Sequence, residues 1–478
     1  MLASGQRPRN ALFTLHIGLL VLAATMPRSF GQNASPAPPP VPELFSPDRS
    51  TLLGDMGGLR PALDKLGATL TITEDAEVMG NVTGGVHRGA EFDGLTTMTL
   101  AVDTAKAFGW DGGTFNISGL QIHGRDLSSD NLHVLQTASD IAAARATRLW
   151  ELWYQQTFLG GKADVKIGQQ SVDQEFLVSQ FAFMFLNAAT GWPALPSANL
   201  YGGGPAYPLS SLGVRFRGHP SDNVTVLGGV FDDNPPGGPF NNDPQLRGAE
   251  AAGVRFDLGT GALFIAELQY AANQPPADAK APAPAGLPGT YKLGGYFDTG
   301  RFPDQRFDDT GLSLASPLSS GIPQMHHGNF AAYAVVDQTV WQPEPKGPRS
   351  LGVFLRVMGA PPTMNLVTLS ANAGVNLKAP LPGRDADSFG IGYGVVKISS
   401  RASERDLDTA FFTGTDFPIR SQEQYIEIMY QMQLAGWWVI KPDFQYFVDP
   451  GGGIPNPRAP EQRIKNEAVL GLRSTITF

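Results

Sequence analysis

Charged residues stand singly in stretches where apolar and polar side chains alternate. In "GVRFRG", Arg215 and Arg217 alternate with Val214 and Phe216, and Glu267 stands between two apolar residues in "FIAELQY". An arginine offers five N–H donors in a fixed fork, and a carboxylate accepts several hydrogen bonds. Brought onto one surface, such side chains can pair with each other and hold water. They are the residues of this chain best placed to do chemistry.

The sequence lacks the residue patterns of catalysis and metal binding. It has no cysteine, which excludes disulfides, thiol catalysis and thiolate metal sites. His326 and His327 have no third ligand at metal spacing, and nothing fixes the separation of Asp173 and Glu175. "GGGP" lacks the Lys-Ser/Thr of a phosphate-binding loop. We therefore predict no catalytic residue, no metal, no cofactor and no enzyme activity. The net charge of -9 also argues against a nucleic-acid partner.

The period of the apolar residues indicates that β-strands position these charges. In one run, Phe264 and Leu268 lie on one face, while Glu267 and Gln269 lie on the other. Segments rich in Gly, Pro, Asp and Asn separate such runs. The pattern predicts seventeen strands, at 69–79, 94–103, 114–124, 148–158, 162–170, 211–218, 224–232, 250–257, 262–272, 290–298, 329–341, 350–359, 366–377, 387–398, 423–434, 437–447 and 465–478.

The N-terminal residues predict export from the cytoplasm. Residues 1–31 have a positive start, a short apolar stretch and small residues before Gln32, which is typical of a cleaved signal peptide. The apolar stretch is shorter than the ~20 residues of a spanning helix, and an uncleaved anchor is the alternative. Residues 32–66 are predicted to form a proline-rich linker and a short N-terminal helix near Leu59 to Leu66.

Alternation alone does not say which face lies inside, so a secreted β-sandwich and a membrane barrel both fit it. The predicted signal peptide, the mixture of short turns with long loops and the aromatic residues near strand ends favour the barrel. We therefore predict an all-β fold for residues 67–478, a transmembrane antiparallel β-barrel with short periplasmic turns and long external loops. Bacterial barrels have even strand numbers, so we predict sixteen strands. The stretches 69–79 and 366–377 match the pattern least well.

Several motifs occur in an order that resembles a known family. They are "LLGDMGGLRPALDKLG", "RLWELWYQQTFLGGKADVKIGQQSVDQEF", "GGPAYPLSSLGVR", "KPDFQYFVDPGGG" and the terminal "GLRSTITF". From about residue 52 onward, the chain resembles the carbohydrate-selective porins (OprB type) of Gram-negative outer membranes. The resemblance implies a porin that passes glucose and similar sugars by passive diffusion through a narrow, charged constriction. The sequence does not predict a role for the segments 273–289 and 299–328.

A sugar presents hydroxyls and apolar C–H faces, so a selective channel needs donors, acceptors and aromatic surface. Charges on the polar rows would face the lumen, because an Arg or Lys facing lipid costs about 2–4 kcal/mol near the midplane. Our first candidates for pore contacts are Arg215, Arg217, Arg255 and Glu267. Further candidates are Glu151, Lys166, Arg356, Glu427, Asp443, Gln445 and Arg473. For each of them, a wall network of paired charges is the alternative.

The long segment 171–210 is predicted to fold into the lumen and narrow it, with an apolar helix at 178–186. Its Trp192, Tyr201 and Tyr207 would offer aromatic platforms at the constriction. An external loop packed on its neighbours is the alternative.

The last predicted strand carries Leu470 and Leu472 on an apolar row and Arg473 on the other. We expect the apolar row to face lipid and Arg473 to face the lumen. We also expect this strand to close the barrel against the first strand, with Phe478 resembling the signal read by the barrel assembly machinery. An ordinary edge strand is the alternative.

The expected partners are mono- or small oligosaccharides, outer-membrane lipid and the barrel assembly machinery, and a homo-oligomer is left open. Two other functions stay open. One is a general, weakly selective diffusion porin. The other, from a different class, is a secreted β-sandwich that binds or hydrolyses glycans.

Overall fold

The computed structural model describes residues 49–240, 251–275, 284–345 and 347–478. The predicted signal peptide, most of the linker after it and part of the 273–289 segment lie outside the described residues.

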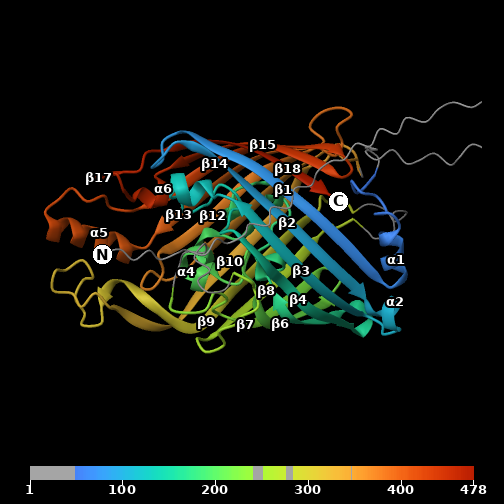
Figure 1. The fold of residues 1–478 in the computed structure, drawn as a ribbon, viewed down its shortest axis with the longest axis horizontal. Coiled ribbons are helices and arrows are strands. Elements are labelled where there is room, and N and C mark those ends of the chain that lie inside the picture. Colours follow the sequence, from blue (N-terminus) through green and yellow to red (C-terminus); the bar gives the residue numbers. More distant parts are fainter. Residues whose placement is uncertain (1–48, 241–250, 276–283, 346) are drawn as a thin grey trace, which may run out of the picture. The chain divides into compact units, whose positions relative to one another are not determined.

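Sixteen antiparallel strands close into a barrel, and β18 lies between β15 and β1 (Figure 1). The prediction of an all-β barrel with sixteen strands is confirmed. The strands are β1 Ala68–Thr83, β2 Gly89–Asp103, β3 Gly113–Gly124, β4 Ala146–Phe158, β5 Ala163–Gln170, β6 Ser211–Ser221, β7 Val224–Asp232, β8 Ala262–Ala272, β9 Gly289–Asp308, β10 Pro323–Trp341, β11 Ser350–Gly359, β12 Val367–Lys378, β13 Ser388–Ile398, β14 Gln422–Ala435, β15 Trp438–Val448 and β18 Glu467–Thr477.

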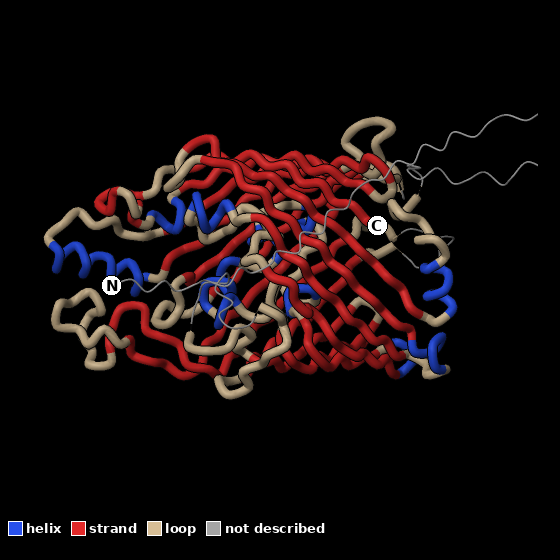
Figure 2. The backbone as a smooth tube through the Cα atoms, viewed as in Figure 1, coloured by secondary structure: helices blue, strands red, loops and turns tan. Residues whose placement is uncertain are grey.

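Short helices and one small sheet complete the described structure (Figure 2). The helices are α1 Leu59–Lys65, α2 Thr104–Phe108, α3 Ala188–Gly191, α4 Ala194–Asn199, α5 Ser400–Thr413 and α6 Pro450–Gly453, and β16 Pro455–Asn456 pairs with β17 Ala459–Arg463. Helices α1 and α2 lie at the end of the barrel where turns are short, and α5 lies at the other end (Figure 1). None of the described helices has the length and apolar character needed to cross a bilayer.

The barrel turns its apolar rows outward and its charges inward. On β18, Leu470 and Leu472 are 53% and 52% exposed, whereas Arg473, which follows Leu472 on the other row, is 4% exposed. A β-sandwich would bury the apolar row and leave the charge in water. The reverse arrangement suits a barrel whose outer face meets lipid, so the secreted β-sandwich alternative is wrong.

One predicted strand is wrong, and it is neither of the two that matched the pattern least well. The stretches 69–79 and 366–377 form β1 and β12, whereas residues 251–257 form a loop. This loop packs on the end of β4, where Leu149 N donates to Ala252 O at 2.9 Å. The alternation in "GVRFD" therefore reflects loop packing.

Strands β9 and β10 continue beyond the predicted strands into the 299–328 segment. They form a long hairpin whose tip is bounded by Asp308, which accepts hydrogen bonds from Thr310 and Ser319. His326 lies on this extension, with Nε2 2.9 Å from Asp304 Oδ2. Residues 299–328 alternate too little for the pattern to predict this extension.

Strand β18 closes the barrel, as predicted, so the edge-strand alternative is wrong. It pairs with β1 on one side and β15 on the other. Phe478 N donates to Ile72 O at 2.9 Å, and Arg60 of α1 donates to Phe478 O. The first and last strands are thus joined by a continuous ladder and by α1.

Candidate functional site

The segment 171–210 lies inside the barrel, where it bonds to the inner face of ten strands. Wall carboxylates accept its backbone N–H groups: Glu267 from Leu177 at 2.9 Å, and Glu427 from Leu186 at 2.6 Å. The strands involved are β4, β5, β6, β8, β9, β10, β11, β12, β14 and β15. Helix α4 of this segment packs against β12 (Figure 1).

The apolar helix predicted at 178–186 does not form. This stretch holds only a 3-10 turn at Ala182–Met184. One reason lies at Leu186, because its N–H, which a helix would bond internally, donates to Glu427 of the wall instead, at 2.6 Å. Gln180 N is held by the wall as well, at 2.9 Å from Asp337. The apolar pattern was real, but it reflects burial inside the barrel.

Cationic wall side chains bind the carbonyls of the same segment. Arg356, 1% exposed, donates to Leu177 O at 2.9 Å and Gly191 O at 2.8 Å, and also to Ala189 O. Lys292 and Lys441 bind two further carbonyls of the segment. Because a buried charge is costly unless it is hydrogen-bonded, these residues and the segment stabilise each other.

A ladder of charges joins the segment to β5 and β6. Arg215 bonds to Asp164 on the wall and reaches Glu175 of the segment, with Nε 2.6 Å from Oε2. Lys166 also pairs with Glu175, and Arg217 Nε lies 2.7 Å from Asp164 Oδ2. Sequence reasoning missed Asp164 and dismissed Glu175, because their partners are distant in sequence or lie on the inserted segment.

A second segment, residues 125–145, also enters the barrel, and the sequence did not predict this. Glu423 of β14 accepts Leu135 N and Gln136 N, each at 2.8 Å. The two inserted segments bond to each other, since Asp140 N donates to Leu186 O at 2.8 Å. Its length and its apolar residues between β3 and β4 were the available signal.

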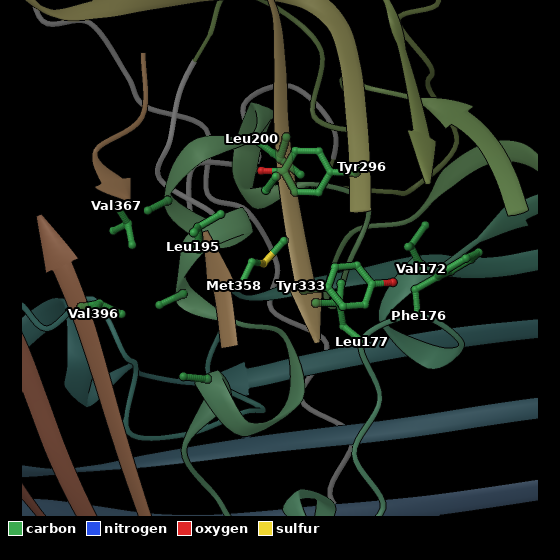
Figure 3. Packing of buried hydrophobic residues seen from close by; sticks show 14 of the residues in the cluster. Val172, Phe176, Leu177, Leu195, Leu200, Tyr296, Tyr333, Met358, Val367 and Val396 are labelled. Atoms are coloured by element: carbon green, nitrogen blue, oxygen red, sulfur yellow. The ribbon is translucent and has the colours of Figure 1, made fainter. Parts of the chain in front are cut away.

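Apolar side chains of both inserted segments pack on apolar residues of the wall (Figure 3). Phe176, Leu195 and Leu200 from the segment 171–210 meet wall residues that include Tyr333 and Met358. The inner face is therefore not uniformly polar. At the level of the segments it forms a conventional hydrophobic core, which excludes water from part of the lumen.

Most of the predicted lumen residues hold the inserted segments. Glu151 accepts Ser171 N at 3.1 Å, and Gln445 donates to Ala138 O at 2.7 Å and to Asp443 at 2.9 Å. Arg473 pairs with Glu77 and with Asp140 of the segment 125–145, at 2.7 and 2.5 Å. With Glu267, Arg356 and Glu427, these side chains form the wall network that the sequence left as the alternative.

Arg217 and Arg255 differ from that group. The Arg217 side chain remains 36% exposed, and it lines a cavity of about 220 Å³ with Gln269 and Lys292. Arg255 lies on the loop before β8, not on the wall, and lines a cavity of about 10 Å³. That volume holds at most about one water molecule, so this cavity gives Arg255 no room to contact a sugar.

The three predicted aromatic platforms also fall into two groups, one fully packed and one that borders a cavity. Tyr201 is buried against Phe302, with ring centroids 5.4 Å apart, and its OH donates to Arg301 O at 2.6 Å. It therefore offers no open ring. Trp192 and Tyr207 are half-buried, and both line a cavity of about 480 Å³.

Cavities lie on both sides of the inserted segments. The 480 Å³ cavity is lined by residues of long connecting segments, including Leu366 and Ile454. The 220 Å³ cavity and another of about 240 Å³ are lined by wall residues toward the short turns, among them His219 and Gln342. Such cavities can bind a solute on either side of the part of the lumen that the inserted segments occupy, without any covalent chemistry.

Comparisons with known proteins bear on this arrangement. Residues 87–478 match the family model described as "Carbohydrate-selective porin, OprB family". Porin B from Pseudomonas aeruginosa is 25% identical, over 91% of this chain and 93% of that protein. The putative porin QuiX from Acinetobacter baylyi is 22% identical, over 91% and 95%. The high-pH structure of Pseudomonas putida OprB has the same fold, with a TM-score of 0.78 and 23% identity, over 91% of this chain and 100% of that chain.

Proposed function

The chain belongs to the carbohydrate-selective porin (OprB) family of the Gram-negative outer membrane, and from this we propose that it passes glucose and similar small neutral sugars by passive diffusion. As a porin, it moves solutes without transforming them. Family membership alone does not say which sugar is preferred or which residues contact it, and the proposal adds both.

The cavity beside Arg217 is the observation that carries this proposal. Arg217 and Lys292 offer N–H donors there, and Gln269 offers a donor and an acceptor, and residues of the segment 171–210 complete the lining. These groups suit hydroxyls approaching from several directions. Binding at such a site must be weak enough to let the solute leave, as conduction through a channel requires.

Conductance of the purified protein in planar bilayers tests the proposal. Glucose at millimolar concentration is expected to reduce the ion current in a saturable way. Arg217→Ala should raise the half-blocking concentration several-fold, and Arg458→Ala, an exposed loop arginine, should leave it unchanged. A current that no sugar blocks would indicate a general, weakly selective diffusion porin.

Export and assembly form the second part of the proposal. The signal peptide of residues 1–31 is cleaved before Gln32, and the barrel is then inserted by the assembly machinery, which reads Phe478. The end with short turns faces the periplasm, in keeping with the rule for outer-membrane barrels. N-terminal sequencing of protein from purified outer membranes should begin at Gln32, and a start at Met1 would contradict cleavage.

A further inference from the structure

The cavity of about 480 Å³ at the long-loop end has the size of a ligand site. Small-molecule pockets span roughly 300–1,000 Å³. The two inserted segments supply most of its lining, and Leu366 and Ile454 close it from other loops. It is separate from the Arg217 cavity, with which it shares no lining residue.

Two aromatic rings in this cavity have fixed positions. Trp192 Nε1 donates to Gly203 O at 2.8 Å, and the Tyr207 OH donates to Ile141 O at 2.8 Å. Because the polar atoms of both rings are already bonded, the rings offer the cavity mainly apolar surface. Fixed rings also lose little conformational entropy when a ligand binds.

His133, Thr137 and Ser197 are among the uncharged polar side chains that line the same cavity. Within the described residues, none of these side chains makes a hydrogen bond. Burial lowers the pKa of His133, and the neighbouring His87 lowers it further. The imidazole is therefore neutral at pH 7, with one nitrogen as donor and the other as acceptor.

Each of the two carboxylates at this cavity has at least one partner. Asp126 Oδ1 accepts Ser128 N at 2.8 Å, and Asp140 lies 2.5 Å from Arg473. The other oxygen of Asp126, Oδ2, is buried without a hydrogen-bond partner among the described residues and is a further acceptor. A ligand therefore meets mostly neutral donors and acceptors, with this one carboxylate oxygen, beside apolar rings. This combination suits a molecule with hydroxyls around its edge and C–H groups on its face.

We infer that this cavity is an outer binding site for neutral pyranose sugars of one or two rings, occupied before the sugar reaches the narrowed level. The C–H face of the sugar stacks on Trp192 and Tyr207, and its hydroxyls bond to His133, Thr137 and Ser197. This inference rests on the proposed transport of sugars.

The site is preformed, because its walls are held by the rest of the structure. Ala188 N donates to Thr137 O at 2.9 Å, which ties the two segments together next to the cavity. Glu423 fixes the segment 125–145 to β14 by three hydrogen bonds, from Leu135 N and from Gln136 N and Nε2. A preformed site binds without an ordering cost.

Isothermal titration of the detergent-solubilised protein with glucose and maltose tests the outer site. The double variant Thr137→Val, Ser197→Ala keeps the side-chain shapes and removes two hydroxyls that do not bond within the described structure. We expect its sugar affinity to fall by about three- to tenfold, as one or two lost hydrogen bonds predict. The control Thr409→Val on α5, a half-buried threonine outside the cavity, should bind sugar as the parent does.

Sidedness separates this inference from transport itself. In an oriented bilayer, the double variant should weaken block by sugar added at the long-loop end, whereas Arg217→Ala should weaken block from either side. Unchanged affinity in the double variant, with Arg217→Ala still impaired, would overturn the outer site and leave sugar transport intact. If the parent protein neither binds sugar nor is blocked by it, both proposals fail.

Discussion

Arg356 illustrates how a charge on the inner face can serve the fold instead of the solute. It stands on the polar row of β11, as alternation predicts, yet its two terminal nitrogens donate to carbonyls of the segment 171–210. A solute in the lumen has no access to it. The same holds for Glu427 and Glu267, whose oxygens receive backbone amides of that segment.

Replacing Arg356 with alanine should lower the free energy of unfolding by several kcal/mol. Each buried carbonyl left without a donor costs about 1–3 kcal/mol. Urea titration in lipid vesicles, followed by tryptophan fluorescence, measures this change. Arg349→Ala is the matched control, because the exposed Arg349 donates to Ala379 O and Pro380 O in a turn that water reaches. Equal losses in both variants would contradict the role given to burial.

The sequence could predict whether a strand residue lies on the inner or the outer face of the barrel. It could not predict that residue's hydrogen-bond partners. The alternation of apolar and polar residues correctly placed Arg215, Glu427 and Arg473 on the inner face. Which of them stays open depends on contacts such as Glu427 with Leu186, 241 residues apart. No local pattern carries that information, so Arg217 could not be distinguished from Arg215.

At the scale of elements, alternation identified strands well and failed where apolar residues had another use. Residues 251–257 alternate because they pack on β4, and residues 178–186 are apolar because they are buried inside the barrel. The segment 125–145 escaped notice since its bonds to β14 and β18 are invisible in its own composition.

Releasing the segment 171–210 from the wall should widen the channel. Replacing residues 178–186 with a Gly-Ser stretch of equal length removes the amides bound by Asp337 and Glu427 in their present geometry, along with the buried side chains. We expect single-channel conductance to rise severalfold and block by glucose to weaken. The same replacement at 311–319, in the tip of the β9–β10 hairpin, should change neither. Unaltered conductance in the first variant would show that this stretch does not narrow the lumen.

Strand β18 should depend on its final aromatic residue for assembly. Phe478→Ser keeps the backbone bonds to Ile72 and Arg60 available, so a loss would come from the side chain. We expect less heat-modifiable, folded barrel in outer membranes. Phe411→Ser, on the exposed face of α5, should assemble normally. Normal yield of the Phe478 variant would contradict its role as an assembly signal.

At the scale of the whole molecule, the outward apolar face defines the environment of the barrel. An arginine at Leu472, in the middle of β18, should cost about 2–4 kcal/mol of folding free energy, the expected penalty for that side chain facing lipid near the midplane. Folding titrations into lipid vesicles measure it. Leu318→Arg is the control, because Leu318 is exposed in the hairpin tip beyond the barrel. A cost at Leu472 no greater than at Leu318 would argue against contact with lipid there.

The inserted segment also has a mechanical consequence. It bonds to β8 and to β14, which have five strands between them around the barrel. A barrel with an empty lumen is easily flattened by lateral pressure from the bilayer. A segment that bonds to several parts of the inner wall resists this change of cross-section. The bore should therefore keep its dimensions when bilayer tension or thickness changes, so that the current through one barrel varies little from one lipid composition to another.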